Sequence, residues 1–236
     1  MATPTPTAWS QAYSAGRLFA AFSLETNAIP QEGEEHLTSI GKDLISTLES
    51  EFFTLEKKDL ESIKQALTTT VGRVREGITL SMVLCFLSEN VLYLFTSGGG
   101  KAILKRGEKI GTVLEADESQ NIKSASGYVQ EEDIIILQTK SFQKVIPPST
   151  LASSLDNNTP DNIAENLAPH LHEKSEGAAS AVILLYKEGN AQGIAVTPAQ
   201  VSEDENAETS SSEPIPVEDV DEEAQTLEQT DRKSVV

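Results

Sequence analysis

The sequence predicts an α+β fold, and three patterns support that prediction. Between residues 37 and 74, apolar side chains recur at steps of three and four, which is the period of helices with one buried face. Between 78 and 138, short apolar runs alternate with polar or glycine-containing turns, as in strands. Further helix and strand patterns follow. Paired helices should therefore cover an antiparallel sheet, and the pattern leaves open whether that sheet is single or double.

The first half of the chain is expected to contain a strand, two helices and a series of strands. Residues 16–24 are a short apolar run of the kind that forms a buried strand. The two helices carry their apolar stripes at Leu37, Ile40, Leu44, Ile45, Leu48 and Phe52, and at Leu60, Ile63, Leu67, Val71 and Val74. The strands that follow are predicted to form an antiparallel meander from 78–87, 91–96, 101–105 and 110–114.

The second half is expected to alternate between strands and helices. Residues 122–128 are a weaker strand candidate, whereas 133–138 form the nearly continuous apolar run of a strand covered on both faces. A helical stretch should follow Pro147-Pro148. Another should begin at Thr159, which can cap a helix whose first position suits Pro160. The last expected elements are a central strand at 178–186 and a short edge strand at 193–196.

Composition divides the chain into three parts. The whole chain of 236 residues carries a formal charge of -19, and more than half of it lies after Ser202, where twelve acidic residues face two basic ones. Serine, proline and acidic residues replace any hydrophobic period there, which is typical of disorder. We therefore predict a flexible N-terminal segment at 1–13, one domain at 14–197, and a disordered acidic tail at 198–236.

The same composition argues against several classes of function. Nucleic-acid binding needs clustered Lys and Arg, and an anionic membrane surface needs them too, whereas this chain is acidic. No apolar run is long enough to cross a bilayer, and the first residues lack the pattern of a secretory signal. Cys85 lies within an apolar strand and is expected to be a buried, unreactive thiol. A cytoplasmic protein with a protein partner is the expectation.

Three stretches resemble the metal-dependent protein serine/threonine phosphatases of the PPM type, also called type 2C phosphatases. Residues 92–107 are similar to that family's central strand, turn and strand, where the turn reads Gly-Asp-Ser-Arg. Residues 127–137 are similar to its acidic turn and the strand leading to an Asp-Gly metal motif, and 179–186 to its last core strand. With the order of elements, the resemblance covers about residues 15–187. It implies an α-β-β-α sandwich, in which helix pairs cover two antiparallel sheets.

The resemblance also implies a reaction and a set of ligands. Members of the family hold two divalent metal ions on aspartates at strand ends and hydrolyse phosphoserine or phosphothreonine. A pair of hard cations such as Mg²⁺ or Mn²⁺ needs several carboxylates to offset four positive charges. The positions that match these motifs are Ser23 and Leu24 after the first strand, Gly99 in the central turn, Lys140 after 133–138, and Gly177 and Ala178 before the last strand.

None of these six residues is a carboxylate, so the sequence predicts a pseudophosphatase. We expect no catalytic residue, no metal site and no cofactor, and a function as a protein-binding or regulatory module. Two alternatives remain open. One is a divergent active phosphatase that binds Mg²⁺ or Mn²⁺ through displaced acids, for which the candidates are Glu25, Glu131, Glu132, Asp133 and Glu176. The other is an unrelated α+β binding domain with a similar strand order.

Overall fold

The computed structural model describes residues 5–28, 36–156, 159–174, 177–188 and 190–196. Within them the chain forms two five-stranded sheets, and every neighbouring pair of strands is antiparallel. The predicted acidic tail at 198–236 lies outside the described residues. No helix in the described part of the chain is long and apolar enough to span a bilayer.

The first sheet contains most strands of the N-terminal half. Its order is β1-β2-β3-β4-β7. These strands are β1 (Ala8–Ala15), β2 (Leu18–Thr26), β3 (Ile78–Ser88), β4 (Val91–Ser97) and β7 (Lys123–Tyr128). The second sheet has the order β10-β9-β8-β5-β6. Its strands are β5 (Lys101–Arg106), β6 (Lys109–Glu115), β8 (Ile134–Gln138), β9 (Ala181–Lys187) and β10 (Asn190–Val196).

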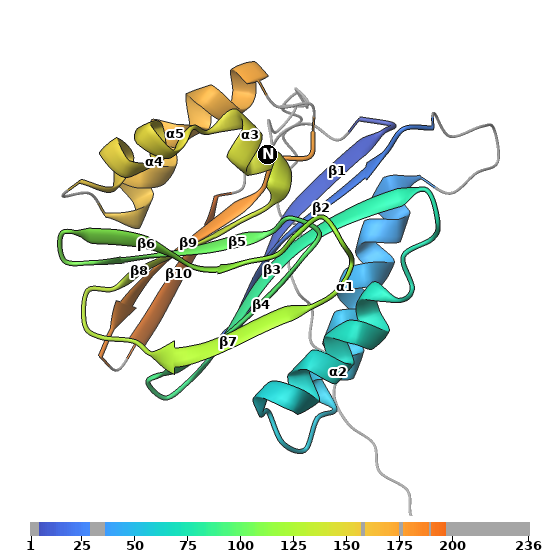
Figure 1. Ribbon diagram of the computed structural model, residues 1–236, viewed down its shortest axis with the longest axis horizontal. Helices are drawn as coiled ribbons and strands as arrows, with labels where there is room; N and C mark the ends of the chain where they lie inside the picture. The colour runs from blue at the N-terminus through green and yellow to red at the C-terminus, as the bar shows by residue number, and fades with distance from the viewer. Residues whose placement is uncertain (1–4, 29–35, 157–158, 175–176, 189, 197–236) are drawn as a thin grey trace, which may run out of the picture. The chain divides into compact units, whose positions relative to one another are not determined.

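Helices cover the outer face of each sheet (Figure 1). The first sheet carries α1 (Leu37–Phe53) and α2 (Leu60–Val71). The second carries α3 (Lys140–Val145), α4 (Pro148–Leu155) and α5 (Pro160–Lys174). Asp59 caps α2 by accepting a hydrogen bond from the Ser62 amide at 2.9 Å. The layers are therefore helix, sheet, sheet and helix, which confirms the α-β-β-α sandwich.

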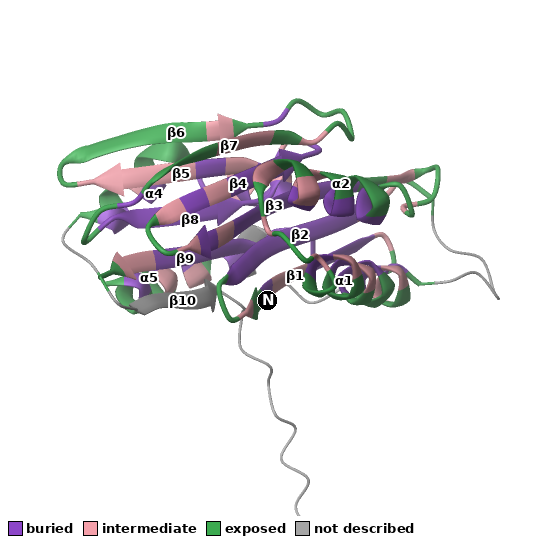
Figure 2. Cartoon of the chain, turned by 90° about the horizontal axis from the view of Figure 1, so that it is seen from below, coloured by how far each residue is buried: buried purple, intermediate pink, exposed green. Residues whose placement is uncertain are grey.

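Three apolar cores separate these layers, and they follow the two-residue alternation of the strands. Along β2, Ala20 and Phe22 face the first helix pair, whereas Phe19 and Ala21 face the second sheet. Both faces of β2, β3 and β8 are buried, as Figure 2 shows in purple. Cys85 lies between the sheets, where complete burial raises the pKa of its thiol, as expected for an unreactive cysteine.

The N-terminal segment differs from its prediction. Residues 1–13 were expected to be flexible, but Ala8–Ala15 form β1, which pairs along its whole length with β2. Trp9 is buried against α1, where Gly41 leaves room for its ring. Tyr13 donates a hydrogen bond of 2.9 Å to Glu49 of α1, and burial together with this bond raises the pKa of Tyr13 to about 12. The sequence gives little sign of this strand, because Thr, Ala and Ser residues dominate it and neighbouring elements supply most of its apolar contacts.

The predicted meander is also wrong at one turn. β4 and β5 were expected to pair, but β4 pairs with β3 and β7, and β5 pairs with β6 and β8. The turn between them carries the chain from one sheet to the other. Gly98 and Gly99 have φ of +60° and +79°, values that favour glycine. A Cβ on Gly98 would lie 1.8 Å from the Leu80 carbonyl oxygen, so the crossing requires glycine there.

Candidate functional site

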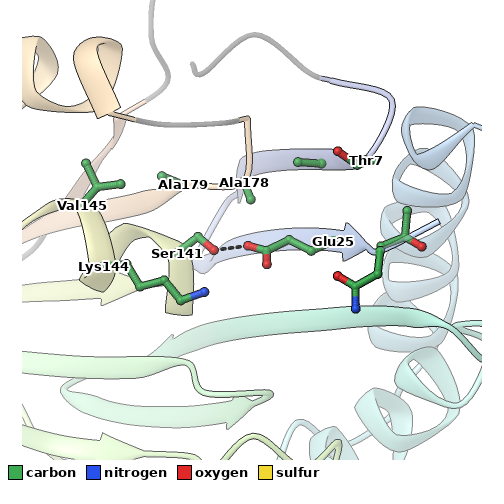
Figure 3. Close-up of a pocket in the computed structure, with 10 residues that line it drawn as sticks. Thr7, Glu25, Ser141, Lys144, Val145, Ala178 and Ala179 are labelled. Atoms are coloured by element: carbon green, nitrogen blue, oxygen red, sulfur yellow. Dashed lines mark hydrogen bonds between the residues drawn. The ribbon is translucent and has the colours of Figure 1, made fainter. Parts of the chain in front are cut away.

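A pocket of about 530 Å³ opens where the two sheets end together. The ends of β2 and β8 meet there with the start of β1 and the segment before β9 (Figure 3). Polar side chains supply much of its lining, and four small or apolar residues supply the rest. The lining residues are Thr7, Ala8, Glu25, Thr26, Asn27, Ser141, Lys144, Val145, Ala178 and Ala179.

Two charged side chains define the chemistry of this pocket. Glu25 extends from β2 and accepts a hydrogen bond from the hydroxyl of Ser141 in the first turn of α3 (Figure 3). Lys144 lies one helical turn beyond Ser141 and lines the same pocket. Glu25 is half-buried, whereas Lys144 is exposed. The described lining residues thus contain one carboxylate and one ammonium group, so their formal charges cancel.

Beneath the pocket, serines replace the apolar residues that otherwise fill the space between the sheets. Ser10, Ser23 and Ser81 are opposite one another on β1, β2 and β3, and each is at most 3% exposed. Ser10 donates to the Ala179 carbonyl at 3.3 Å, and Ser81 accepts from the Lys140 amide at 3.0 Å. Leu24, the other residue singled out on this strand, is buried in the core facing the helices.

The central glycine turn lies beside this region and is already filled. The Gly98 and Gly99 amides donate to the carbonyl oxygens of Ser119 and Asp117, at 3.0 and 2.7 Å, so neither is available to an anion. Lys140 does not line the pocket. Its Nζ is 2.7 Å from Glu118, and this contact lowers the pKa of Glu118, with Lys144 adding a smaller effect. The cation within the pocket is therefore Lys144, one turn further along α3.

The segment before β9 brings backbone and small side chains to the pocket. Gly177 adopts φ of +92°, and Ala178 lines the pocket with its methyl group. Thr139, at the end of β8, donates to the Ser180 carbonyl at 3.1 Å and accepts from the Ser180 amide at 3.1 Å, which fixes this segment. Glu176, one of the displaced acids considered above, lies outside the described residues.

These residues do not fit a pair of divalent metal ions. Among the described residues, no three His, Cys, Asp or Glu side chains come together to hold one. Glu25 is the single carboxylate among the described residues of the pocket lining, and Lys144 adds a positive charge where two metals would already bring four. No step of a metal-assisted reaction can be assigned to this arrangement.

The other displaced acids lie at the opposite end of β8. Asp133 precedes that strand and Ser141 follows it, and the 5 residues of β8 between them span about 17 Å at about 3.3 Å per residue. Asp133 is fully buried and receives hydrogen bonds from the Arg106 guanidinium at 2.6 and 2.8 Å and from the Gln130 amide at 2.8 Å. Glu131 accepts a hydrogen bond from the Glu188 amide. Asp133 and Glu131 serve the structure of that end and do not converge with Glu25.

This architecture is similar to that of known proteins of solved structure. No protein-family model and no curated protein matches the sequence. Solved structures do match. The chain has the PPM phosphatase fold. It is similar to the catalytic domain of the serine/threonine phosphatase PstP in complex with two manganese ions, with a TM-score of 0.60, 12% identity, and coverage of 78% of this chain and 91% of that one.

Two further structures extend this comparison. The PPM Ser-Thr phosphatase MsPP from Mycobacterium smegmatis matches with a TM-score of 0.56 and 10% identity, over 75% of this chain and 91% of that one. The phosphatase domain of SpoIIE from Bacillus subtilis matches with a TM-score of 0.51 and 13% identity, over 85% and 90% of the two chains. What this chain shares with these structures is the fold of the sandwich.

Sequence reasoning identified part of this site. The segments at Ser23, Lys140 and Ala178 do approach one another, because β2 and β8 end at the edge where β9 begins. Ser10, Ser81 and Lys144 were missed. A periodic signal was available for Ser81, a hydroxyl residue in the otherwise apolar strand β3, but not for Ser10, because β1 contains several polar residues. Lys144 gave no signal, because α3 was not predicted.

Proposed function

We propose that this PPM-fold domain is a catalytically inactive pseudophosphatase that acts as a protein-binding or regulatory module. One observation carries the proposal: among the described residues that line the pocket, Glu25 is the single carboxylate, and it lies there together with Lys144. A two-metal hydrolytic site needs several oxygen ligands that offset the charge of the ions and orient the attacking water. Here hydroxyl, methyl and ammonium groups surround the pocket instead.

The alternative, a divergent phosphatase with displaced ligands, finds little support in the geometry. Glu131 and Asp133 lie at the far end of β8 and already have partners there. Among the described residues, no cluster of acids that could hold a metal ion forms around Glu25, and Ser141 already donates to its carboxylate. A neutral hydroxyl cannot replace a bridging carboxylate between two cations. Both candidate functions are distinguished by the same assay.

The test is a phosphatase assay on the purified full chain. With p-nitrophenyl phosphate or a phosphoserine peptide, in Mn²⁺ or Mg²⁺, we expect no phosphate release above the rate of buffer alone. Calorimetric titration with Mn²⁺ should show no saturable heat. Release that a chelator abolishes, and that Glu25→Gln also abolishes while the exposed Glu108→Gln does not, would establish the divergent phosphatase and end this proposal.

A binding role predicts that the pocket contacts a protein partner. The recess is large enough to receive a few side chains of a partner segment, and its neutral, polar lining suits hydrogen bonding more than charge attraction. Affinity capture with the full chain should yield a partner that Lys144→Glu loses. Lys109→Glu, an exposed change on β6 outside this pocket, is the matched control and should keep the partner. Equal capture by both variants would remove the pocket from the proposal.

A further inference from the structure

The pocket edge has a structural property beyond the loss of metal ligands. We propose that hydrogen bonds made by serine side chains join the two sheets at this edge, so that the folded domain does not depend on divalent cations. The serine clasp, as we name it, consists of Ser10, Ser81 and Ser141. Each makes one contact between a strand of the first sheet and a segment that belongs to the second.

The three contacts are spread across the width of the edge. Ser10 of β1 donates to the carbonyl of Ala179, just before β9. Ser81 of β3 accepts from the amide of Lys140, just after β8. Between them, Ser141 of α3 donates to Glu25 of β2. Three neighbouring strands of one sheet are therefore attached to the flanks of two strands of the other.

The position of the clasp explains why it is needed. Further inside, the sheets are held by apolar contacts such as those of Ala21, Val83 and Leu137. At the edge those contacts end, and buried backbone groups of the strand ends need partners. Serine is small enough to let the sheets approach and supplies a donor or an acceptor as required. The Lys140 amide, at the first position of α3, has no partner within its own helix and finds one in Ser81.

The charges at this edge also support a fold that does not depend on divalent cations. Where several carboxylates face one another, their repulsion must be offset by cations, and removing the cations destabilises the fold. Here the clasp residues are neutral, and Ser23 lies between Ser10 and Ser81 in the same row. Among the described residues that line the pocket, Glu25 is the one carboxylate and Lys144 the one cation, and nearby Glu118 is paired with Lys140. No repulsion needs a metal ion, so adding or removing one should change nothing.

Thermal unfolding of the full chain tests the clasp. Ser81→Ala and Ser141→Ala should each lower the Tm by about 2–4 °C, the effect of one hydrogen bond in a protein of this size. Ser153→Ala is the matched control, because that exposed hydroxyl bonds only within α4, and it should leave the Tm nearly unchanged. Mn²⁺, Mg²⁺ and a chelator should each leave the Tm of the unmodified chain unchanged.

Hydrogen exchange separates a local clasp from a general loss of stability. In Ser81→Ala the Lys140 amide loses its acceptor, so it should exchange at least about tenfold faster. The exchange rates of amides in the middle of β3 should change only as much as the global stability changes. A saturable rise in Tm with Mn²⁺, or clasp variants no different from Ser153→Ala, would overturn the proposal. The serine variants measure folding and not catalysis or partner binding, so their outcome is independent of the phosphatase assay and the capture experiment, whereas a rise in Tm with Mn²⁺ would also count against the proposed function.

Discussion

The two ends of β8 differ in the way their buried polar groups find partners. At its start, Asp133 is a fully buried carboxylate held by the Arg106 guanidinium and a backbone amide. At its end, the pocket edge uses neutral hydroxyls, and the neighbouring turn at Gly98 lies directly against the backbone of β3. A buried charge is stable only with its partners, whereas close backbone packing depends on the absence of a side chain. The buried acid Asp133 thus lies at the end of β8 away from the pocket that Glu25 lines.

Gly98 offers the largest expected effect. Gly98→Ala combines a positive φ with a Cβ that would lie 1.8 Å from the Leu80 carbonyl oxygen, so we expect a loss of about 4 kcal/mol in unfolding free energy. Gly99→Ala is the matched control: φ is also positive, but the new atom would meet only the flexible Lys140 side chain, at 3.1 Å. Urea denaturation measures both. Equal losses of unfolding free energy in the two variants would mean that the close contact of Gly98 with the backbone of β3 does not account for the effect.

Arg106 tests the other end of β8. Arg106→Ala leaves the Asp133 carboxylate buried with fewer partners, so we expect a loss of about 3 kcal/mol. Lys109→Ala, an exposed change on the adjacent strand, should cost no more than about 0.5 kcal/mol. Denaturant titrations of the two variants supply the comparison. A small loss for Arg106→Ala would show that Asp133 does not need its guanidinium partner.

The smallest effect is expected at the exposed pair of Lys140 and Glu118, beside the glycine turn. Lys140 lowers the pKa of Glu118, so this carboxylate contributes stability above its unfolded pKa and loses that contribution as the pH falls through its lower folded pKa. Glu118→Gln should therefore flatten the acid limb of a stability profile slightly and leave neutral stability nearly unchanged, because the pair is exposed. A steeper acid limb in the variant would contradict this sign.

The sequence predicted those features that repeat along an element. The helices at Leu37 and Leu60, the buried strand before Gln138 and the four-layer arrangement all follow from periodic apolar residues or from the family resemblance. β1 escaped prediction because Trp9 and Tyr13 stand among small and polar residues, and their burial depends on α1, far along the chain. Contacts made by distant segments leave no local period.

The crossing from β4 to β5 shows a second kind of failure. Two apolar runs joined by Ser97-Gly98-Gly99-Gly100 are the usual signature of a hairpin, and a tight turn between strands is the natural reading. What decides otherwise is the backbone of β3, on which the glycines rest. At the site, the motif positions predicted where the strand ends meet, but the partners Ser10 and Ser81 come from strands whose pairing the motifs do not contain.

Cys85 can report how often the sandwich opens. It is the chain's single cysteine, and it lies in the apolar layer between the sheets with a thiol whose pKa burial has raised. A thiol reagent can reach it only when the sheets separate, so the rate of labelling reports how often the sandwich opens and not how reactive the sulfur is. The labelling rate of Cys85 can therefore be measured in each variant discussed above without adding a probe. An opening confined to the pocket edge would leave that rate unchanged.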